Sequence, residues 1–368
     1  MVIDRVALVS FRNYGELSAS FCDGVNVITG RNAQGKTNLI EAVFYIASGR
    51  SFRARSDREL VRFGDTRASI RADITSGGRA QCLEAFLEYG RRRRLIANGA
   101  PLRSAAELSG KLSAVLFCPG DLDIVRDGAA GRRRLMDTCL CQLRPRYAAA
   151  LREFNRLYDH KTAILRNHGE KPRLLDALDD FNVRLAQCSA QLIWFRAAFT
   201  ATLAEKAAAV HREFSGGVEE LQISYKTVST ITDARRGPEE LLTAILEHQR
   251  AHRQAEIDSG QCLTGAHKDD LEIGINGAAA RAYASQGQAR TAALSLKLAE
   301  REIHFDDRGE YPVLLLDDVL SELDAERAGF VLNKIKNGQV LITCCEYDGA
   351  AASAEGTVVR VEGGEIVR

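Results

Sequence analysis

Short apolar segments separated by polar turns fill the first third of the chain, and this pattern predicts β-strands. The segments with this pattern are residues 6–11, 17–21, 25–29, 68–74 and 82–89. The third of them is almost entirely apolar, as expected of a strand that is buried on both faces. Since the pattern ends near residues 116–119, we expect the sheet-forming part to end there.

From about residue 121 to about residue 212 the apolar positions recur at helical spacing. Glycine and proline nearly vanish between residues 173 and 211. In that stretch apolar side chains recur at steps of three and four residues, at Leu185, Cys188, Leu192, Phe195 and Phe199. One face of a long amphipathic helix requires this spacing, so the middle of the chain is predicted to be mainly helical.

Strands and helices alternate again in the last third, after a weaker strand pattern at 221–228 and a helical one at 238–257. Strands are predicted at 271–275, 313–316 and 340–343, and a helix at 287–303. The simplest architecture is an α/β domain built from both chain ends, residues 1–119 and 258–368. A mainly helical lobe, residues 120–257, is inserted between them. The length of 368 residues agrees, because one core rarely grows past about 250 to 300 residues.

Net charge argues against a uniformly basic, nucleic-acid-coating surface, because 50 lysines and arginines balance 49 acidic residues. Local basic stretches occur at residues 50–62, 91–94, 132–134 and 144–173. For each of them a solvated charged face is the alternative to a nucleic-acid contact.

The first residues include an acid and a base, and no apolar run approaches the roughly 18 residues of a membrane helix. We therefore expect a cytoplasmic protein. The nine cysteines form no C-x-x-C pair, so we expect them to fill apolar space rather than to bind zinc or form a redox motif.

Residues 30–37 read GRNAQGKT and match the phosphate-binding pattern G-x-x-x-x-G-K-[ST], between an apolar strand and a helical run. In such a loop the glycines let backbone N–H groups turn onto phosphates, Lys36 reaches the β and γ oxygens, and the Thr37 hydroxyl binds Mg²⁺. The predicted ligand is ATP. The residues expected to contact it here are Gly30, Arg31, Asn32, Ala33, Gln34, Gly35, Lys36, Thr37 and Asn38.

A second acidic position for the metal follows the apolar run at residues 313–316, where Asp317 and Asp318 stand together. A buried strand that ends in two carboxylates suits a phosphate-binding loop. Asp317 is expected to hold Mg²⁺, directly or through water. Asp318 is expected to orient or deprotonate the attacking water as a catalytic base.

A third element is the run Ser285, Gln286, Gly287 and Gln288, at the start of a predicted helix. Ser285 can cap that helix, and Gly287 lets backbone N–H groups approach an anion. An ordinary helix cap is the alternative. Its position shortly before the two aspartates resembles the ABC and SMC ATPases, in which this signature of one subunit closes on the γ-phosphate held by the other. Ser285 is then expected to act across a dimer, with the catalytic Lys36 and Asp318.

Further blocks narrow the resemblance: FRNY at 11–14, NLIEA at 38–42, GRSFR at 49–53, PGDL at 119–122, RRRLMD at 132–137, GAHKDD at 265–270 and LLDDVLSELD at 315–324. Together with the phosphate-binding loop they resemble the RecF family of recombination and repair proteins. This resemblance implies an ABC/SMC-type P-loop ATPase head with an inserted helical lobe, using ATP and Mg²⁺.

The resemblance also implies an ATP-dependent homodimer on double-stranded and gapped DNA, with weak DNA-stimulated ATP hydrolysis that resets it. RecR with RecO, and RecA functionally, are the implied partners in gap repair and replication restart. Among the basic stretches, Arg50, Arg53 and Arg55 follow the predicted P-loop helix, so we rank them first as DNA contacts.

Some positions depart from the wider ABC pattern. The strand at 340–343 runs into Cys344 and Cys345, where many ABC ATPases place a histidine, and Thr343 is only a weak substitute. No glutamine stands out as a metal sensor, and His267 and Lys268 have no assigned role. The alternatives are the nucleotide-binding subunit of an ABC transporter and a P-loop kinase. The large helical insertion disfavours the first, and the signature helix disfavours the second.

Overall fold

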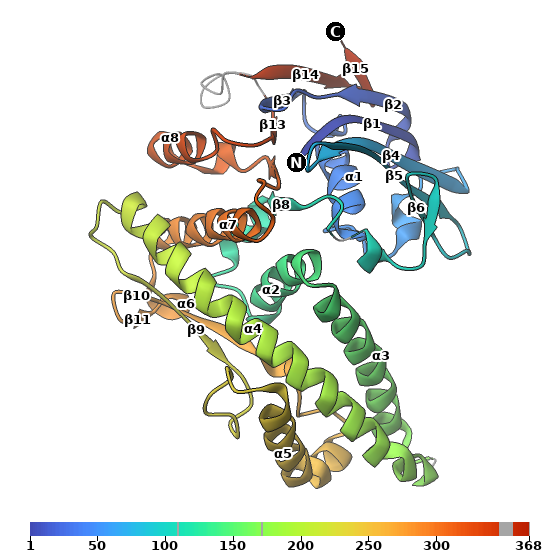
Figure 1. Cartoon of the computed structure of the whole chain (residues 1–368), viewed down its shortest axis with the longest axis vertical. Helices are drawn as coiled ribbons and strands as arrows, with labels where there is room; N and C mark the ends of the chain where they lie inside the picture. Colours follow the sequence, from blue (N-terminus) through green and yellow to red (C-terminus); the bar gives the residue numbers. More distant parts are fainter. Residues whose placement is uncertain (109, 171, 346–355, 368) are drawn as a thin grey trace. The chain divides into compact units, whose positions relative to one another are not determined.

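The computed structural model describes residues 1–108, 110–170, 172–345 and 356–367, which form two compact units. The first, the head, comprises Met1–Asp123, Glu213–Gly217 and Gln286–Arg368. The second, the lobe, comprises Ile124–Arg212 and Val218–Ser285. The elements of both units are labelled in Figure 1. Within the described residues, no helix has the combination of length and apolar character that crossing a membrane requires.

One sheet of the head is antiparallel, with strand order β2-β1-β4-β5-β6-β7. Its strands are β1 (Val2–Phe11), β2 (Tyr14–Ser20), β4 (Arg67–Ser76), β5 (Arg79–Glu88), β6 (Arg94–Ala97) and β7 (Ala100–Leu102). Along its strands, buried apolar side chains on one face alternate with more exposed, mostly polar side chains on the other. This arrangement is the expected result of a two-residue side-chain period in a half-buried sheet.

The other sheet of the head has the order β15-β14-β3-β13-β12-β8 and is parallel except at β15. Its strands are β3 (Val25–Thr29), β8 (Ala114–Phe117), β12 (Val313–Asp317), β13 (Val340–Cys344), β14 (Thr357–Glu362) and β15 (Glu365–Val367). Every residue of β8, β12 and β13 is buried, which explains their mainly apolar sequences.

The head core lies around helix α1 (Lys36–Ser48), which contacts β4 and β5 of the first sheet and β8, β12 and β13 of the second. Leu39, Ile40 and Phe44 of α1 belong to one buried cluster with side chains of both sheets. The remaining helices of the head are α7 (Gln286–Arg308) and α8 (Ala325–Lys334), with short 3₁₀ turns η1 (Asp57–Leu60), η2 (Ala105–Glu107), η3 (Pro119–Asp123) and η6 (Leu320–Glu322). Burial of α1 therefore fixes the P-loop between two sheets.

The lobe is mainly helical, as predicted. Its helices are α2 (Ala129–Leu143), α3 (Pro145–Asn167), α4 (Leu178–Phe214, whose last two residues belong to the head), α5 (Pro238–Ser259) and α6 (Ala280–Tyr283), with 3₁₀ turns η4 (Pro172–Ala177) and η5 (Ala266–Lys268). A three-stranded sheet of order β11-β10-β9 completes it, from β9 (Leu221–Lys226), β10 (Asp270–Ile275) and β11 (Ala278–Ala279).

The division into units differs from the sequence-based boundaries, because residues 258–285 lie in the lobe rather than in the C-terminal part of the head. The cause is strand pairing. β10 pairs with β9 along its whole length, from Asp270 opposite Lys226 to Ile275 opposite Leu221. A strand pattern at residues 271–275 could not reveal which sheet the strand joins.

Candidate functional site

The predicted phosphate-binding loop, residues 30–35, runs directly from β3 into α1. Gly30 and Gly35 have φ angles of 152° and 121°, and a Cβ atom at either would collide, with the carbonyl of Val361 or the hydroxyl of Tyr14. Both positions therefore require glycine. Gly35 is also the N-cap of α1, and having no side chain it leaves the first N–H groups of the helix open toward an anion.

Lys36 is held inside this loop rather than extended into solvent. Its side chain is buried, and Nζ donates hydrogen bonds to the carbonyl oxygens of Gly30 at 2.6 Å and Arg31 at 3.0 Å. The Sγ atom of Cys345 lies 3.8 Å from the same nitrogen. One positive charge is thus concentrated where the loop backbone turns, as phosphate binding requires.

Asp317, at the end of β12, meets Thr37 at the start of α1. The Thr37 hydroxyl donates to Oδ1 of Asp317 at 2.9 Å, and the Thr343 hydroxyl contacts the same oxygen at 3.0 Å. Burial raises the pKa of Asp317, although the two hydroxyls and the charge of Arg53 act in the opposite direction. A buried carboxylate that is paired only with hydroxyls keeps the oxygen donors that Mg²⁺ prefers, and Thr37 adds another.

Asp318 stands beside this pair with a different geometry. Its φ angle of 55° lies in the left-handed region, which is uncommon for a residue with a side chain. The backbone N–H of Asp318 donates to the Thr343 hydroxyl at 2.8 Å, and the Ser321 hydroxyl donates to its carbonyl oxygen at 2.8 Å. The carboxylate is only half-buried, so it can reach water. Backbone strain at a carboxylate next to a phosphate loop is typical of a functional position.

Thr343 is the residue whose role the sequence understated. It is fully enclosed and links Asp317 to the backbone of Asp318. Its place at the end of β13, next to β12 in a parallel sheet, was the available signal. Cys344 and Cys345, where a histidine is expected by comparison with many ABC ATPases, follow Thr343 directly.

The FRNY block, which spans the end of β1, the following turn and the start of β2, supports the loop. Asn13 donates from Nδ2 to the carbonyl of Gln34 at 2.9 Å and accepts from Asn38 at 2.7 Å. The Tyr14 hydroxyl donates to the carbonyl of Gly35 at 2.8 Å. Each carbonyl that is bound in this way cannot turn toward a phosphate, so these contacts keep the loop N–H groups facing the ligand.

Comparison with known proteins finds relatives that match almost the whole chain. The family model for the RecF/RecN/SMC N-terminal domain matches residues 2–364. The DNA replication and repair protein RecF of Acetivibrio thermocellus is 38% identical over 348 residues, covering 95% of this chain and 94% of the relative. The protein of the same name from Ruminiclostridium cellulolyticum is 35% identical, covering 100% and 99%.

The chain belongs to the RecF family.

Solved structures give the same result for the fold of this RecF-family chain. Two structures of the recombination mediator protein RecF in the RecFOR pathway, designated RecF-ATPrS and RecF-ATP, are each 31% identical, with TM-scores of 0.92 and 0.90. Each alignment covers 99% of this chain, and it covers 97% of the RecF-ATPrS chain and 96% of the RecF-ATP chain. An Smc head bound to a ScpA winged-helix domain has a TM-score of 0.59 at 15% identity, which shows a shared fold. The predicted fold class, an ABC/SMC-type ATPase head, is confirmed.

The signature residues of this RecF-family chain lie at the start of α7, since Ser285 directly precedes it and Gln286, Gly287 and Gln288 form its first turn. Ser285 and Gln286 are exposed, whereas Gly287 and Gln288 are half-buried. The following turn is anchored in the head. Thr291 donates to the carbonyl of Gly287 at 3.0 Å, and Arg327 of α8 donates to the Thr291 hydroxyl at 3.1 Å.

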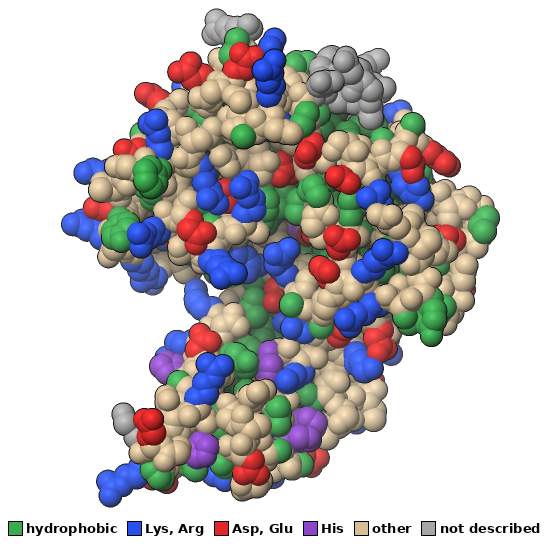
Figure 2. Space-filling view, turned by 180° about the vertical axis from the view of Figure 1, so that it is seen from behind, with side chains coloured by type: hydrophobic (Ala, Val, Ile, Leu, Met, Phe, Trp, Pro, Cys, Tyr) green, Lys and Arg blue, Asp and Glu red, His purple; other side chains and the backbone are tan. Residues whose placement is uncertain are grey.

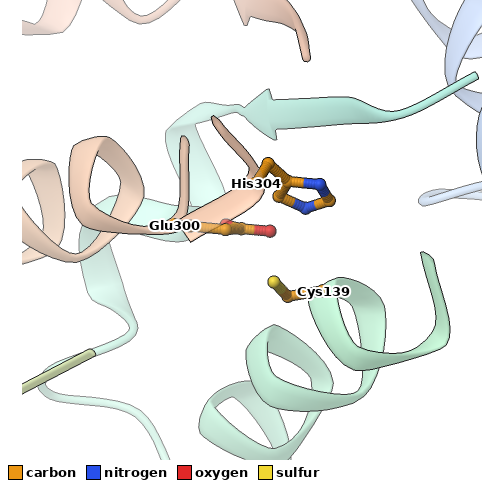
Figure 3. Close-up of side chains that lie close together, drawn as sticks. All are labelled: Cys139, Glu300 and His304. Carbon is orange, nitrogen blue, oxygen red and sulfur yellow. The ribbon is translucent and has the colours of Figure 1, made fainter. Parts of the chain in front are cut away.

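Buried charges continue along α7 behind the signature. Glu300 forms an ion pair with Lys297, and His304 lies one turn beyond Glu300 (Figure 3). Burial, with the charges of Arg308 and Lys297, lowers the pKa of His304 to about 3, so its ring is neutral near pH 7. The third side chain labelled in Figure 3, Cys139, belongs to α2 of the lobe.

The three arginines ranked as DNA contacts follow α1 and are exposed. Arg53 connects to the nucleotide site, because its Nη1 atom donates to Asn38 at 3.4 Å and its charge lowers the pKa of Asp317. Arg53 is therefore a candidate for balancing nucleotide phosphate as well as DNA. The roles of Arg50 and Arg55 stay predictions.

The GAHKDD block lies in the lobe and has a structural role. Asp269 is fully buried and accepts hydrogen bonds from Arg196 at 2.6 Å, Tyr225 at 2.5 Å and Thr227 at 2.7 Å. Burial acts to lower the pKa of Arg196, but the neighbouring Tyr147 and the carboxylates of Asp137 and Asp269 hold it above its ordinary value. Asp270 pairs with Arg132 at 2.7 Å. These two acids of the block are thus occupied by arginines inside the lobe.

Proposed function

We propose that this chain is an ATP-dependent DNA-binding recombination mediator whose head dimerises when it binds ATP and separates after hydrolysis. The observation that carries the proposal is the 2.9 Å contact between Thr37 and Asp317, with Lys36 held in the same loop. It supports binding of ATP with Mg²⁺, because a hydroxyl and a carboxylate of two different elements converge beside the phosphate-binding loop motif and the N-terminus of α1.

Each residue has a defined task in this proposal. Lys36 and the N-terminus of α1 bind the β and γ phosphates. Thr37 and Asp317 supply oxygen ligands to Mg²⁺, which neutralises phosphate charge when it is bound. Asp318 accepts a proton from the attacking water, and its distorted backbone, fixed by Thr343, orients the carboxylate. Gly30 to Asn38 thus form the nucleotide-binding surface of one subunit.

The signature at Ser285 to Gln288 completes the site from a second copy of the chain in this proposal. Hydrolysis then depends on dimerisation, and linkage requires that anything favouring the dimer tightens ATP binding equally. We propose duplex and gapped DNA as that factor. RecR with RecO, and RecA functionally, are the proposed partners.

The proposal is tested by measuring ATP hydrolysis with and without double-stranded DNA, and the sedimentation of the protein with ATP or ADP. We expect DNA to stimulate hydrolysis and ATP to produce a dimer that ADP does not. Asp318→Asn should form a stable dimer, the wild type a transient one, and Ser285→Arg none, while Ser285→Arg still binds ATP. An ATP-independent dimer in all three would rule out the clamp mechanism.

The DNA contacts have their own test. Reversing the charges of Arg50 and Arg55 should lower the salt dependence of duplex binding by about one unit of slope per lost phosphate contact. An unchanged slope would place the duplex surface elsewhere on the molecule.

A further inference from the structure

The antiparallel sheet of the head has an outer face with an ordered row of side chains. Val9 lies opposite Ser69, Ser69 opposite Phe86, and Phe86 opposite Arg94, across strands β1, β4, β5 and β6. Residues next to this row in sequence, such as Ala68, point to the inner face of the sheet and are buried in the head core. The row itself therefore faces outward. Val9 is 46% exposed, which is unusual for an apolar side chain in the middle of a sheet.

Val9, Ser69 and Phe86 of this row form the floor of a groove of about 700 Å³. Four arginines border it, Arg67, Arg91, Arg92 and Arg94, against one carboxylate, Glu88. The Glu88 carboxylate is already shared with Arg91 at 3.5 Å. Figure 2 shows basic side chains interspersed with hydrophobic ones on the surface of the head. The groove is therefore strongly positive along its edges and apolar at its base.

The arginines are placed to bind an external anion. The Arg94 guanidinium lies 5.2 Å from the centre of the Phe86 ring, and Arg92 donates to the backbone carbonyl of Arg103 at 3.2 Å. Among the described residues, Arg67 forms no ion pair with an acid. Beyond the groove, Arg58 stacks 4.4 Å over the ring of Tyr89, which is 54% exposed. A guanidinium group held over a ring by a cation–π contact can still donate its N–H groups to phosphate.

We propose that this groove binds single-stranded nucleic acid, with backbone phosphates on Arg67, Arg91, Arg92 and Arg94 and an unpaired base against Val9 and Phe86. A single strand offers an anion and an exposed apolar ring on every nucleotide, which matches charged edges over an aromatic floor. A duplex hides its base faces, so it would leave the floor unused. An acidic protein segment would satisfy the arginines but not the stacking surface.

The inference deepens the proposed function, on which it rests, by assigning the unpaired strand of a gapped substrate to a surface separate from the nucleotide site. The two can fail independently. No residue of the groove takes part in the ATP site described above.

The test measures binding of a labelled dT oligonucleotide over a range of salt concentrations. Arg67→Glu/Arg94→Glu should lower the salt slope by about 1.4, at roughly 0.7 per phosphate contact on a single strand. Phe86→Leu keeps apolar volume but removes the ring, so it should weaken binding by about fivefold or more at an unchanged slope. The matched control is Arg79→Glu, at the opposite end of β5 and outside the groove.

Three results would overturn the assignment. The double arginine variant could keep the wild-type affinity and slope, or Arg79→Glu could lose as much binding as the double variant. The third is that a polyglutamate peptide binds the wild type as tightly as the oligonucleotide does and is also lost in the arginine variant. The last would identify an acidic protein segment as the ligand. ATP binding and duplex-stimulated hydrolysis should be unchanged in all these variants. If the wild type showed neither ATP binding nor duplex-stimulated hydrolysis, the proposed function would be refuted, whereas the oligonucleotide result would still hold.

Discussion

Two buried carboxylates, Asp317 in the head and Asp269 in the lobe, show how similar sequence signals lead to different chemistry. Both stand next to a second aspartate and beside a strand. Asp269 is neutralised by Arg196 and fully used by hydrogen bonds inside the lobe. Among the described residues, the Oδ1 atom of Asp317 accepts hydrogen bonds only from the hydroxyls of Thr37 and Thr343. A carboxylate that lacks a guanidinium partner remains available to a cation, whereas a paired one stabilises the fold.

The largest effect expected from this contrast is on the ATP-hydrolysis rate. Asp318→Asn should slow hydrolysis by about 10² to 10⁴, because an amide cannot accept the proton of water. ATP binding and Mg²⁺ dependence should persist, since Asp317 and Thr37 are intact. Single-turnover rates and Mg²⁺ titrations measure both. If Asp317→Asn alters the Mg²⁺ requirement less than Asp318→Asn does, the two roles are reversed.

In the lobe the corresponding change should affect stability. Asp269→Asn leaves the buried Arg196 with less compensating charge, and breaking a buried pair costs about 3 to 5 kcal/mol. Urea denaturation measures the free energy of unfolding. Glu272→Gln on β10 is the control, because its pair with Lys226 is exposed and contributes about 0 to 1 kcal/mol. Equal losses in the two variants would mean that the Asp269 pair has no special role.

A smaller effect is expected for the lysine of the loop. Lys36→Ala removes a charged hydrogen-bond donor to the phosphates, which is worth about 1.5 to 3 kcal/mol, or roughly 10- to 150-fold in ATP affinity. Calorimetric titration with ATP measures it, and Lys336→Ala, at an exposed position of the head, is the control. Near-normal ATP affinity for Lys36→Ala would contradict the assignment of the loop.

The smallest effect concerns the stability of the nucleotide-free head. Because the pKa of Asp317 is raised above its ordinary value of 3.8, its charge disfavours the folded state at neutral pH. Asp317→Asn should therefore melt at the wild-type temperature or slightly above it. The difference should shrink as pH falls through the raised pKa toward 3.8, where the wild-type carboxyl also becomes neutral. A lower melting temperature for the variant at neutral pH would contradict this.

Much of the head site could be predicted from the sequence because its signals are local. The loop around Lys36 needs only a strand before it and a helix after it, and β12 displays its buried character in an unbroken apolar run. Contacts formed by residues far apart in the chain could not be predicted. Thr343 reaches the site from β13 and Asn13 from the turn between β1 and β2, and hydroxyl or amide side chains of this kind give no periodic signal.

The lobe was harder to interpret for the same reason. Its helical character follows from spacing, but Arg196 is one of 50 basic residues, and no sequence pattern connects it with Asp269, 73 positions away. The predicted domain boundary between residues 257 and 258 separates β9 from β10, although the two strands pair. The residues of a strand do not show which other strand it will pair with.

The neighbours of β3 have a consequence for the order of events during synthesis. This strand, which leads into the nucleotide loop near the N-terminus, lies between β13 and β14, both from the far end of the chain. Gln339 also binds the backbone of Ile3 through a pair of hydrogen bonds. Contacts this distant in sequence form late and slowly. A nascent chain on the ribosome should therefore remain unable to bind ATP until almost its last segment has emerged, with the apolar β3 exposed to chaperones until then.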